Sequence, residues 1–581
     1  MAEIYNPGYD TSGNENDWTP VNINYTTSTA TTYDRVSDVP TLTDENTGNF
    51  ATLNVINKPS SHTLSNGNLT TAITSIGGID STIGVSSGKW YCEVTLTTVG
   101  ADTQLGVTNL TNGFVTAYLG QYTTSWGCIT FNGNRIHNGS QSAYGSSFSN
   151  GDVGMIALDM DTGKWYCGKN GTWFNSGNPA NGTNPAHTGL TGVMKFAIGS
   201  NSSSGNHSIN FGQRPFAYTP PTGYKKLNTY NLPDSSIKDG SQYFDVDTWS
   251  GDSSATTQIA TPFSPDFVWI KNRSNTGGSG AASHMLYDTV RGVQKELQTN
   301  LTDAEGTLSS GLNSFDSDGY KPGTSTRTNE TGNTYVGWAW RASDSTAVTD
   351  PTTGAEYSAN TTAGFSIVKY TGDGDTSASR PYIPHGLGVA PSMIIYKRTD
   401  ATGNWVVTHK SLSSQSQSYL LLNSTAAVAS SSPNTVQGSF NSLGFRPRWT
   451  DASSGNIINT AEYVAYVFAE VEGFSKFGSY EGNGSADGPF VYTGFRPAFV
   501  LFKNADDSRQ WGIVDTSRST YNQTNATLEP STSNAENPYD DFDFLSNGFK
   551  PRTTDPGSNR SGYTIIYMAF AENPFKNSLA R

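Results

Sequence analysis

The sequence predicts an all-β protein, and three observations support this prediction. Aromatic residues make up 12% of the 581 residues, charged residues only 14%, and the chain contains 61 Gly. Strands favour aromatic and β-branched residues with Gly, Asn, Asp and Ser in the turns between them, whereas long helices favour Ala, Leu, Glu, Lys and Arg. A module of about a hundred residues with several short strands also recurs three times, which is typical of β-sandwich domains.

The charge excludes some functions. The formal net charge is −14, from 35 Lys and Arg against 49 Asp and Glu. Phosphate backbones are bound by clustered Lys and Arg, so we expect no nucleic acid partner.

The chain has no apolar run long enough for a transmembrane helix, and its start, MAEIYNPGYDTSGNENDWTP, lacks the basic and apolar regions of a signal peptide. We therefore expect no membrane insertion.

A nine-residue phrase reveals the repeat. It reads FNSLGFRPR at 440–448, FLSNGFKPR at 544–552 and, more loosely, FDSDGYKPG at 315–323. Each copy follows a strand that ends in Lys and precedes an apolar strand that closes on an aromatic residue. From Lys to phrase Gly the spacing is 48, 47 and 45 residues (271 to 319, 397 to 444, 503 to 548). Internal repeats define modules, here A (about 240–342), B (about 363–472) and C (about 473–575).

The phrase has the composition of a corner between strands. We expect Gly319, Gly444 and Gly548 to supply the positive φ of a tight turn, and the aromatic residue after each to face inward. The Pro two residues later suits an edge strand or a bulge. The basic residue between them is most simply a solvated side chain, with ligand binding as the alternative; these residues are Lys321, Arg446 and Lys550.

Two further segments bear on the architecture of the modules. In YDTVRGVQKELQTN (287–300), Val290, Val293 and Leu297 are spaced for a short helix. A polar connection (342–364) separates A from B, whereas B runs directly into C. We therefore expect a rod in which B and C pack closely and A pivots. There are no heptads for a coiled-coil stalk.

The front of the chain, residues 79–217, does not match the repeat. GKWYCEVTL (88–96) alternates, with Trp90, Cys92, Val94 and Leu96 on one face. GDVGMIALDMDTGKWYCGKNGTWF (151–174) reads as three strands with two turns, and SINFGQRPFAY (208–218) follows. These motifs in this order resemble the SPRY family of concanavalin-like β-sandwiches. The resemblance implies binding through loops at one end of the sandwich. Aromatic residues in or beside turns are the binding candidates, with a core position as the alternative for each: Trp126, Tyr144, Trp173 and Phe174.

The polar stretch 16–54 resembles the leader of tail-fibre and other virion proteins of marine tailed phages. LYDTVRGVQKEL, NSFDSDGYKPG and TYVGWAWRA resemble recurrent modules of the same proteins. The resemblance implies a virion component of the tail or a tail appendage, assembled in the host cytoplasm, that recognises the host. It implies other virion proteins and a host cell-surface glycan or protein as partners, and a homo-oligomer, by resemblance a trimer.

The expected division of the chain is a leader and attachment segment at 1–60, a SPRY-like sandwich at 61–225, module A at 226–342, linker and module B at 343–472, and module C at 473–581. A structural role as a decoration or connector of capsid or tail is the alternative function. A polysaccharide depolymerase is the second alternative.

Residues with catalytic or metal-binding potential are few. GVSSG (84–88) matches the nucleophile elbow G-x-S-x-G around Ser86, but the elbow needs a following helix and a strand is predicted here. Carboxylates cluster at Asp159/Asp161, Asp316/Asp318, Asp373/Asp375 and Asp540/Asp541/Asp543. These carboxylates could act as glycosidase pairs or as Ca²⁺ ligands, but Asp beside Gly most often serves to form a turn. The three Cys and seven His show no metal-binding spacing. We therefore expect no enzyme activity, cofactor or metal.

Overall fold

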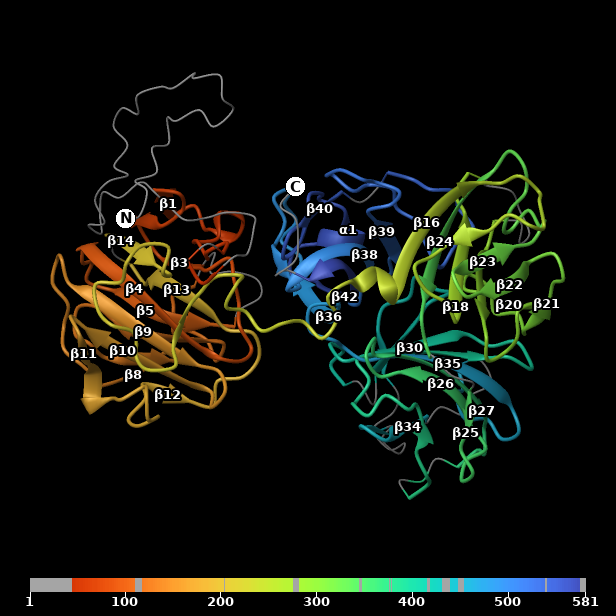
Figure 1. Cartoon of the computed structure of the whole chain (residues 1–581), viewed down its shortest axis with the longest axis horizontal. Coiled ribbons are helices and arrows are strands. Elements are labelled where there is room, and N and C mark those ends of the chain that lie inside the picture. The colour runs from red at the N-terminus through yellow and green to blue at the C-terminus, as the bar shows by residue number, and fades with distance from the viewer. Residues whose placement is uncertain are drawn as a thin grey trace. The chain divides into compact units, whose positions relative to one another are not determined.

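The computed structural model describes residues 44–46, 48–109, 117–202, 204–274, 282–343, 347–375, 377, 379–414, 418–430, 439–447, 454–538 and 541–574. The chain divides into unit 1, up to Asp234, and unit 2, from Ser235 (Figure 1). Strands dominate both units, which confirms the all-β class. Across the described ranges the helices are one α-helical turn, α1 (Pro556–Asn559), and three 3-10 turns, η1 (Val55–Asn57), η2 (Phe174–Ser176) and η3 (Gly240–Gln242). None of these is long and apolar enough to cross a membrane.

Unit 1 contains two antiparallel sheets. The larger has the order β1 (His62–Ser65), β2 (Thr70–Ile73), β14 (Gly205–Asn210), β4 (Lys89–Thr98), β9 (Val153–Asp159), β10 (Lys164–Lys169) and β11 (Thr172–Trp173), with β12 (His187–Thr188) beside β10 and β15 (Lys225–Lys226) parallel to β4. The smaller has the order β3 (Gly77–Asp80), β13 (Lys195–Ser200), β5 (Thr103–Thr108), β6 (Ser125–Ile129), β7 (Arg135–His137) and β8 (Ser140–Ser142).

Strand β4 shows how both faces of the larger sheet are covered. The predicted inward residues Trp90, Cys92, Val94 and Leu96 are buried, as expected. Tyr91 and Glu93 on the opposite face are buried as well. Phe216 lies edge-on to Tyr91 at 4.9 Å between ring centroids, and the Ala217 and Tyr218 amides donate to the Glu93 carboxylate. The end of the SINFGQRPFAY motif, residues 216–218, therefore covers the outer face of this sheet.

Residues 48–57 also belong to unit 1. Phe50, Ala51 and Leu53 are buried, and the Ala51 amide donates to the Leu227 carbonyl at 3.0 Å. This stretch therefore packs on the sandwich, and the expectation of an extended leader is wrong for it. Residues 1–43 and 47 of the expected leader lie outside the described residues.

Unit 2 repeats one plan three times. Each module has a main sheet and a three-stranded sheet that contains the phrase. The main sheet of module A has the order β16 (Phe244–Ser250), β24 (Thr334–Trp340), β18 (Phe267–Asn272), β19 (His284–Asp288), β20 (Lys295–Gln298) and β21 (Gly306–Thr307). The main sheet of module B has the order β25 (Val348–Thr349), β26 (Glu356–Asn360), β27 (Phe365–Thr371), β35 (Glu462–Phe468), β29 (Met393–Arg398), β30 (Trp405–His409), β31 (Ser418–Leu421) and β32 (Ala429–Ser430). The main sheet of module C has the order β36 (Ser475–Glu481), β42 (Thr564–Pro574), β38 (Phe495–Asn504) and β39 (Gly512–Asp515).

The three-stranded sheets place the phrase strand in the middle each time. Their orders are β17 (Ile259–Ala260), β23 (Gly319–Pro322), β22 (Leu312–Asp316) in A; β28 (Ile383–Pro384), β34 (Gly444–Arg446), β33 (Ser439–Phe440) in B; and β37 (Val491–Tyr492), β41 (Gly548–Pro551), β40 (Phe542–Leu545) in C. The phrase strand is therefore not an edge strand, but in module A the ladder register shifts opposite Pro322, between Leu312 and Ser314, which fits the alternative expectation of a bulge. The Pro is tolerated because it ends the strand in A and C and follows it in B.

The phrase glycines are needed for space more than for a turn. Of the three, only Gly319 has a positive φ, 145°. A Cβ on Gly319, Gly444 or Gly548 would lie 2.1, 2.3 or 2.1 Å from the carbonyl oxygen of Ile259, Ile383 or Val491 on the neighbouring strand. The common reason for Gly is thus close backbone approach, which corrects the turn explanation. The aromatic residue after each Gly is buried, as expected: Tyr320, Phe445 and Phe549.

The basic residues of the phrase each contact a neighbouring side chain, and Lys321 and Arg446 remain partly exposed to solvent as expected. Lys550 is buried and lies 2.9 Å from Asp487, and Lys321 lies 2.8 Å from Asp316. The Arg446 guanidinium stacks over the Tyr382 ring at 3.9 Å. Each of them holds its hairpin to a nearby side chain.

Two local expectations in unit 2 are wrong. Residues 287–300 form the end of β19, a turn and β20, because Leu286 pairs with Leu297 across the sheet and buries both side chains. The described residues of the polar connection, 342–343 and 347–364, include two strands. These are β25 and β26, and β26 pairs along its whole length with β27, so both belong to the sheet of module B. The expected pivot is wrong because module A packs against module B in a shared core.

The three modules pack around one shared core in unit 2. The aromatic residues that close the three repeats, Trp340, Phe468 and Phe570, meet there with ring centroids 5.7–6.4 Å apart. Equivalent backbone bonds join each module to the next: Glu305 N to Thr399 O at 2.9 Å, Val428 N to Ala505 O at 2.7 Å, and Glu536 N to Arg273 O at 2.9 Å. Unit 2 is therefore a closed ring of three modules with approximate three-fold symmetry, and the expected rod is wrong.

Candidate functional site

Unit 1 places the four predicted aromatic candidates mostly in its interior. Trp126, Tyr144 and Phe174 are each only 7% exposed, whereas Trp173 is partly exposed. Trp173 packs edge-on against Tyr91 and Tyr166. Burial removes most of these ring surfaces from contact with a partner.

Tyr144 and Phe174 lie together in a packed corner. Their rings meet edge-on at 6.1 Å, and Phe148 contacts Phe174 at 5.5 Å. A Cβ on Gly145 would lie 2.2 Å from the Phe174 ring, so this loop fits only because residue 145 lacks a side chain. The corner holds the 144–148 loop against η2.

Trp126 belongs instead to a cluster of indole and imidazole rings. On the smaller sheet Trp126 pairs across strands with His137, and the rings stack at 4.8 Å and 4°. On the larger sheet Trp165 pairs with His187, and those rings stack at 6.2 Å and 11°. The two imidazoles lie 5.5 Å apart, so the cluster joins the two sheets. We call Trp126, His137, His187 and Trp165 the indole–imidazole shelf.

Arg135 sets the electrostatics of the shelf. Its Nη1 donates to the Ala186 carbonyl, beside His187, and its Nε donates to Ser142 Oγ at 2.8 Å. Burial, then the Arg135 charge, lowers the pKa of His187 to about 4. His137 Nδ1 lies 3.0 Å from the Ser125 carbonyl oxygen, which fixes its ring. At neutral pH the shelf therefore presents an uncharged imidazole at His187.

The shelf has the chemistry of a stacking surface. His137 and His187 are partly exposed, while the two indoles behind them are buried. Fixed flat rings with polar edges suit contact with another ring that carries hydrogen-bonding groups. Sequence reasoning missed the two His because they lie 50 residues apart and only the pairing of β6 with β7 and β10 with β12 brings them together.

The Asp pairs behave as turn residues. Asp159 Oδ1 accepts from the amides of Asp161 and Thr162, and Asp373 Oδ1 accepts from the amide of Asp375. Asp316 pairs with Lys321 and Asp543 with Arg552, while Asp540 lies outside the described residues. Among the residues with described positions, no group of three or more His, Cys, Asp or Glu is placed to hold a metal ion. Ser86 leads directly into β4, without the helix of a nucleophile elbow.

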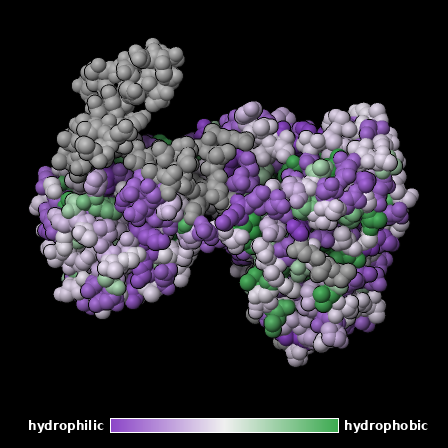
Figure 2. Space-filling model, in the orientation of Figure 1, coloured by the Kyte–Doolittle hydropathy of each residue, from purple (hydrophilic) through white to green (hydrophobic). Residues whose placement is uncertain are grey.

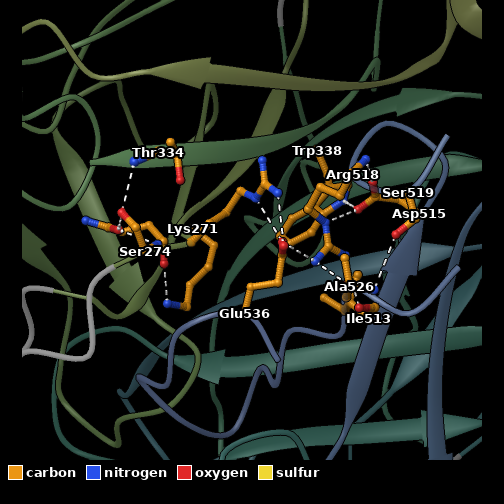
Figure 3. Close-up of polar contacts among 12 residues, drawn as sticks. Lys271, Ser274, Thr334, Trp338, Ile513, Asp515, Arg518, Ser519, Ala526 and Glu536 are labelled. Atoms are coloured by element: carbon orange, nitrogen blue, oxygen red, sulfur yellow. Dashed lines mark hydrogen bonds and ion pairs between the residues drawn. The ribbon is translucent and has the colours of Figure 1, made fainter. Parts of the chain in front are cut away.

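Unit 2 contains a buried charge network where module C meets module A (Figure 3). Arg518 Nε donates to Asp515 Oδ2 at 2.6 Å, and its Nη1 donates to Glu536 Oε2 at 3.1 Å. Arg273 of module A donates two hydrogen bonds to the same Glu536 carboxylate, at 2.8 and 2.9 Å. Trp338 of module A donates its indole N–H to Asp515 Oδ2 at 3.0 Å. These bonds tie C to A.

Charge pairing in this network disfavours Glu536 as a general acid. Burial opposes ionisation, but the hydrogen bonds from Arg273 and the charge of Arg518 hold the pKa of Glu536 below its usual value. A general acid at neutral pH needs the opposite shift. Lys271 lies in the same region, and burial followed by the Arg518 charge lowers its pKa to about 7. The arrangement is that of a structural seam.

The same positions recur at the other two seams. Between A and B, Arg291 pairs with Asp288 at 2.6 Å, and Tyr466 of B donates to Asp288 at 2.8 Å. Between B and C the polar pair is replaced by His409, whose Nε2 lies 3.1 Å from the Tyr567 carbonyl oxygen, and by Leu412. One structural position thus carries Asp, His and Asp in the three modules.

These observations define an all-β protein with a two-sheet sandwich and a three-module ring. Residues 239–574, more than half of the chain, match the family described as "Domain of unknown function (DUF7483)". The chain belongs to this family, and the match spans all three modules of the ring. No curated protein matches the chain.

Solved structures similar to this chain include SPRY domains, the family that the front motifs resemble. The SPRY domain of human HERC1 is 21% identical, with a TM-score of 0.23, over 27% of this chain and 96% of that one. The TRIM65 PSpry domain is 14% identical, with a TM-score of 0.23, over 28% and 92%. Stonustoxin is 18% identical, with a TM-score of 0.23, over 30% of each chain.

Proposed function

We propose that this protein is a non-enzymatic virion component of a tailed phage that attaches to the host cell surface, as part of a tail fibre or tail appendage. The virion role rests on the resemblance of residues 16–54 and of the modules to phage virion proteins. Its partners are other virion proteins and a host glycan or surface protein. The observation that carries the adhesive role is the indole–imidazole shelf of unit 1.

The shelf favours a glycan over a charged ligand. Its partly exposed rings are stacked and held in place, so little side-chain freedom is lost when a sugar ring docks on them. The low pKa of His187 keeps that imidazole neutral at physiological pH, so it suits uncharged hydroxyl groups.

Cell binding tests the adhesive role. Labelled protein should bind intact host cells, and His137→Ala or His187→Ala should lower the bound amount at least tenfold. Tyr521→Ala is the matched control, because Tyr521 is 81% exposed and lies in unit 2. Absence of binding by the folded wild-type protein would remove adhesion as the function.

Immunogold labelling of intact virions separates adhesion from the alternative role of a decoration or connector. Label at the tail tip fits adhesion, whereas label on the head or collar favours the connector. For the depolymerase alternative, incubation with host polysaccharide should release no new reducing ends.

A further inference from the structure

We infer that module C contains a second binding site, a small pocket that takes a single neutral sugar ring. The pocket lies between β38, β39 and α1 and has a volume of about 200 Å³. Drug-sized ligands occupy pockets of about 300–1,000 Å³, so this one suits a single small ring. Its lining residues are Phe502, Arg509, Gln510, Trp511, Gly512, Thr527, Glu529, Asp555 and Gly557.

The pocket is lined by two buried aromatic residues and an unsatisfied hydroxyl. Phe502 and Trp511 are each 1% exposed and line it beside Gly512. Thr527 is also 1% exposed, and its Oγ1 is buried without a hydrogen-bond partner among the described residues. An unpaired buried hydroxyl is costly, so a ligand hydroxyl at this position would gain a ready partner.

Four polar side chains in the lining are each held through one of their atoms and keep further hydrogen-bonding capacity. Gln510 Oε1 accepts from Ser531, and Glu529 Oε2 accepts from Thr532 and Asn534, both at 3.1 Å. Arg509 Nε donates to Asp507 at 3.1 Å, and Asp555 Oδ1 accepts from the Gly557 amide at 2.6 Å.

The other polar atoms of the same groups have no partner in the described part of the chain: the Arg509 Nη atoms, Gln510 Nε2, Glu529 Oε1 and Asp555 Oδ2. This set offers both hydrogen-bond donors and acceptors, as vicinal sugar hydroxyls require.

The charge of the pocket selects against acidic ligands. Two carboxylates, Glu529 and Asp555, face one guanidinium, Arg509. An anionic sugar or a phosphate would meet a net negative lining, whereas a neutral hexose would not.

The lining residue Trp511 is shared with module B, whereas module A differs. Trp405 in B and His284 in A occupy its position, because Asp288, His409 and Asp515 pair equivalently with Phe267, Met393 and Phe499. α1, which closes the pocket, is the only α-helical turn in the described residues. This site is separate from the indole–imidazole shelf of unit 1.

Saturation-transfer NMR and calorimetry on the full chain test this site, with methyl hexopyranosides of glucose, galactose and mannose as probes. At least one should bind with a millimolar or tighter dissociation constant. Thr527→Val removes only the unpaired hydroxyl and should weaken binding at least tenfold, as should Glu529→Gln.

Thr328→Val is the matched control, because Thr328 is a buried Thr of module A whose Oγ1 also lacks a partner in the described residues. Its binding should equal that of the wild type.

Three outcomes would overturn the inference: no binding of any hexopyranoside by folded protein, unchanged binding by Thr527→Val and Glu529→Gln, or tighter binding of glucuronate than of the glucoside. Retained sugar binding by His187→Ala assigns the signal to module C even if cell adhesion fails.

Discussion

Equivalent positions of the three modules hold different residue types, although each residue helps to join its module to the next. Asp288 and Asp515 are fully buried and bound by Arg291 and Arg518, whereas His409 at the third seam makes a bond to a backbone carbonyl. Removing one partner of a buried ion pair destabilises a protein, whereas replacing both partners with apolar or neutral residues is often tolerated. In module B the ion pair is replaced in this way by His409 and Leu412.

Arg518→Leu should lower the free energy of unfolding of unit 2 by about 3–5 kcal/mol, because Asp515 loses its buried partner and Glu536 keeps only Arg273. Chemical denaturation measures this. Arg398→Leu, which breaks the partly exposed pair with Asp400, should cost about 0–1 kcal/mol. Equal losses for both variants would contradict a special role of the seam.

Histidines whose pKa is lowered by the fold should make the protein acid-sensitive. Burial lowers the pKa of His62, His187, His207 and His409 to about 4, from 6.5 in the unfolded chain. Because the unfolded state binds protons first, their contribution to stability is complete above pH 6.5 and is lost as the pH falls towards 4. The melting temperature should therefore drop between pH 6.5 and 4, and His409→Gln should reduce that drop. A flat profile over this window would refute the assignment.

Among the elements, the phrase hairpin shows why a short sequence is repeated so faithfully. Its Gly permits a neighbouring strand to approach closely, and the aromatic residue after the Gly is buried inside the module. Its basic residue forms an ion pair with a nearby Asp in modules A and C. Each position meets a separate steric or electrostatic requirement, so all recur together in the three copies.

Gly548→Ala should destabilise module C by about 2–4 kcal/mol, because its Cβ would overlap the Val491 carbonyl oxygen at 2.1 Å and force the strands apart. Thermal denaturation measures the loss. Gly332→Ala, where no atom lies within 4 Å and φ is 91°, should cost only about 1–2 kcal/mol for the backbone conformation. A smaller cost at Gly548 than at Gly332 would argue against the close-approach explanation.

At the scale of the whole molecule, unit 2 is a ring because no module can bury its second face alone. Phe267, Trp340, Phe365, Phe468, Phe499 and Phe570 cover the inward faces of the three main sheets. An isolated module would expose this aromatic face to water, and such a face is far more apolar than the usual surface of a soluble protein. The face shown in Figure 2 is mostly polar or neutral, with apolar residues in small groups mainly over unit 2.

Trp340→Ala should therefore destabilise all three modules together, by about 3–5 kcal/mol, since Trp340 contacts rings from both other modules. Calorimetry should show one transition for unit 2 that moves as a whole to lower temperature. Tyr521→Ala, at an exposed position, should leave it within about 0.5 kcal/mol. Separate transitions for A, B and C would show that the modules fold independently.

The sequence by itself determined the all-β class, the three modules with their order of strands, and the buried aromatic residue of each phrase. These follow from composition, spacing and alternation, which act over a few residues. The same local reasoning misassigned 287–300 as a helix, because the cross-strand pairing of Leu286 with Leu297 outweighs the helical spacing of its apolar residues.

Only the tertiary structure decided the ring, the shelf and the pocket. The ring requires aromatic residues such as Trp340 and Phe570, 230 positions apart, to meet, and the shelf requires His137 and His187 to face each other from different sheets. The pocket gathers Arg509, Thr527 and Asp555 from three segments of module C. No local pattern marks such residues, because their proximity results from how the sheets pack and not from the spacing of side chains along one strand.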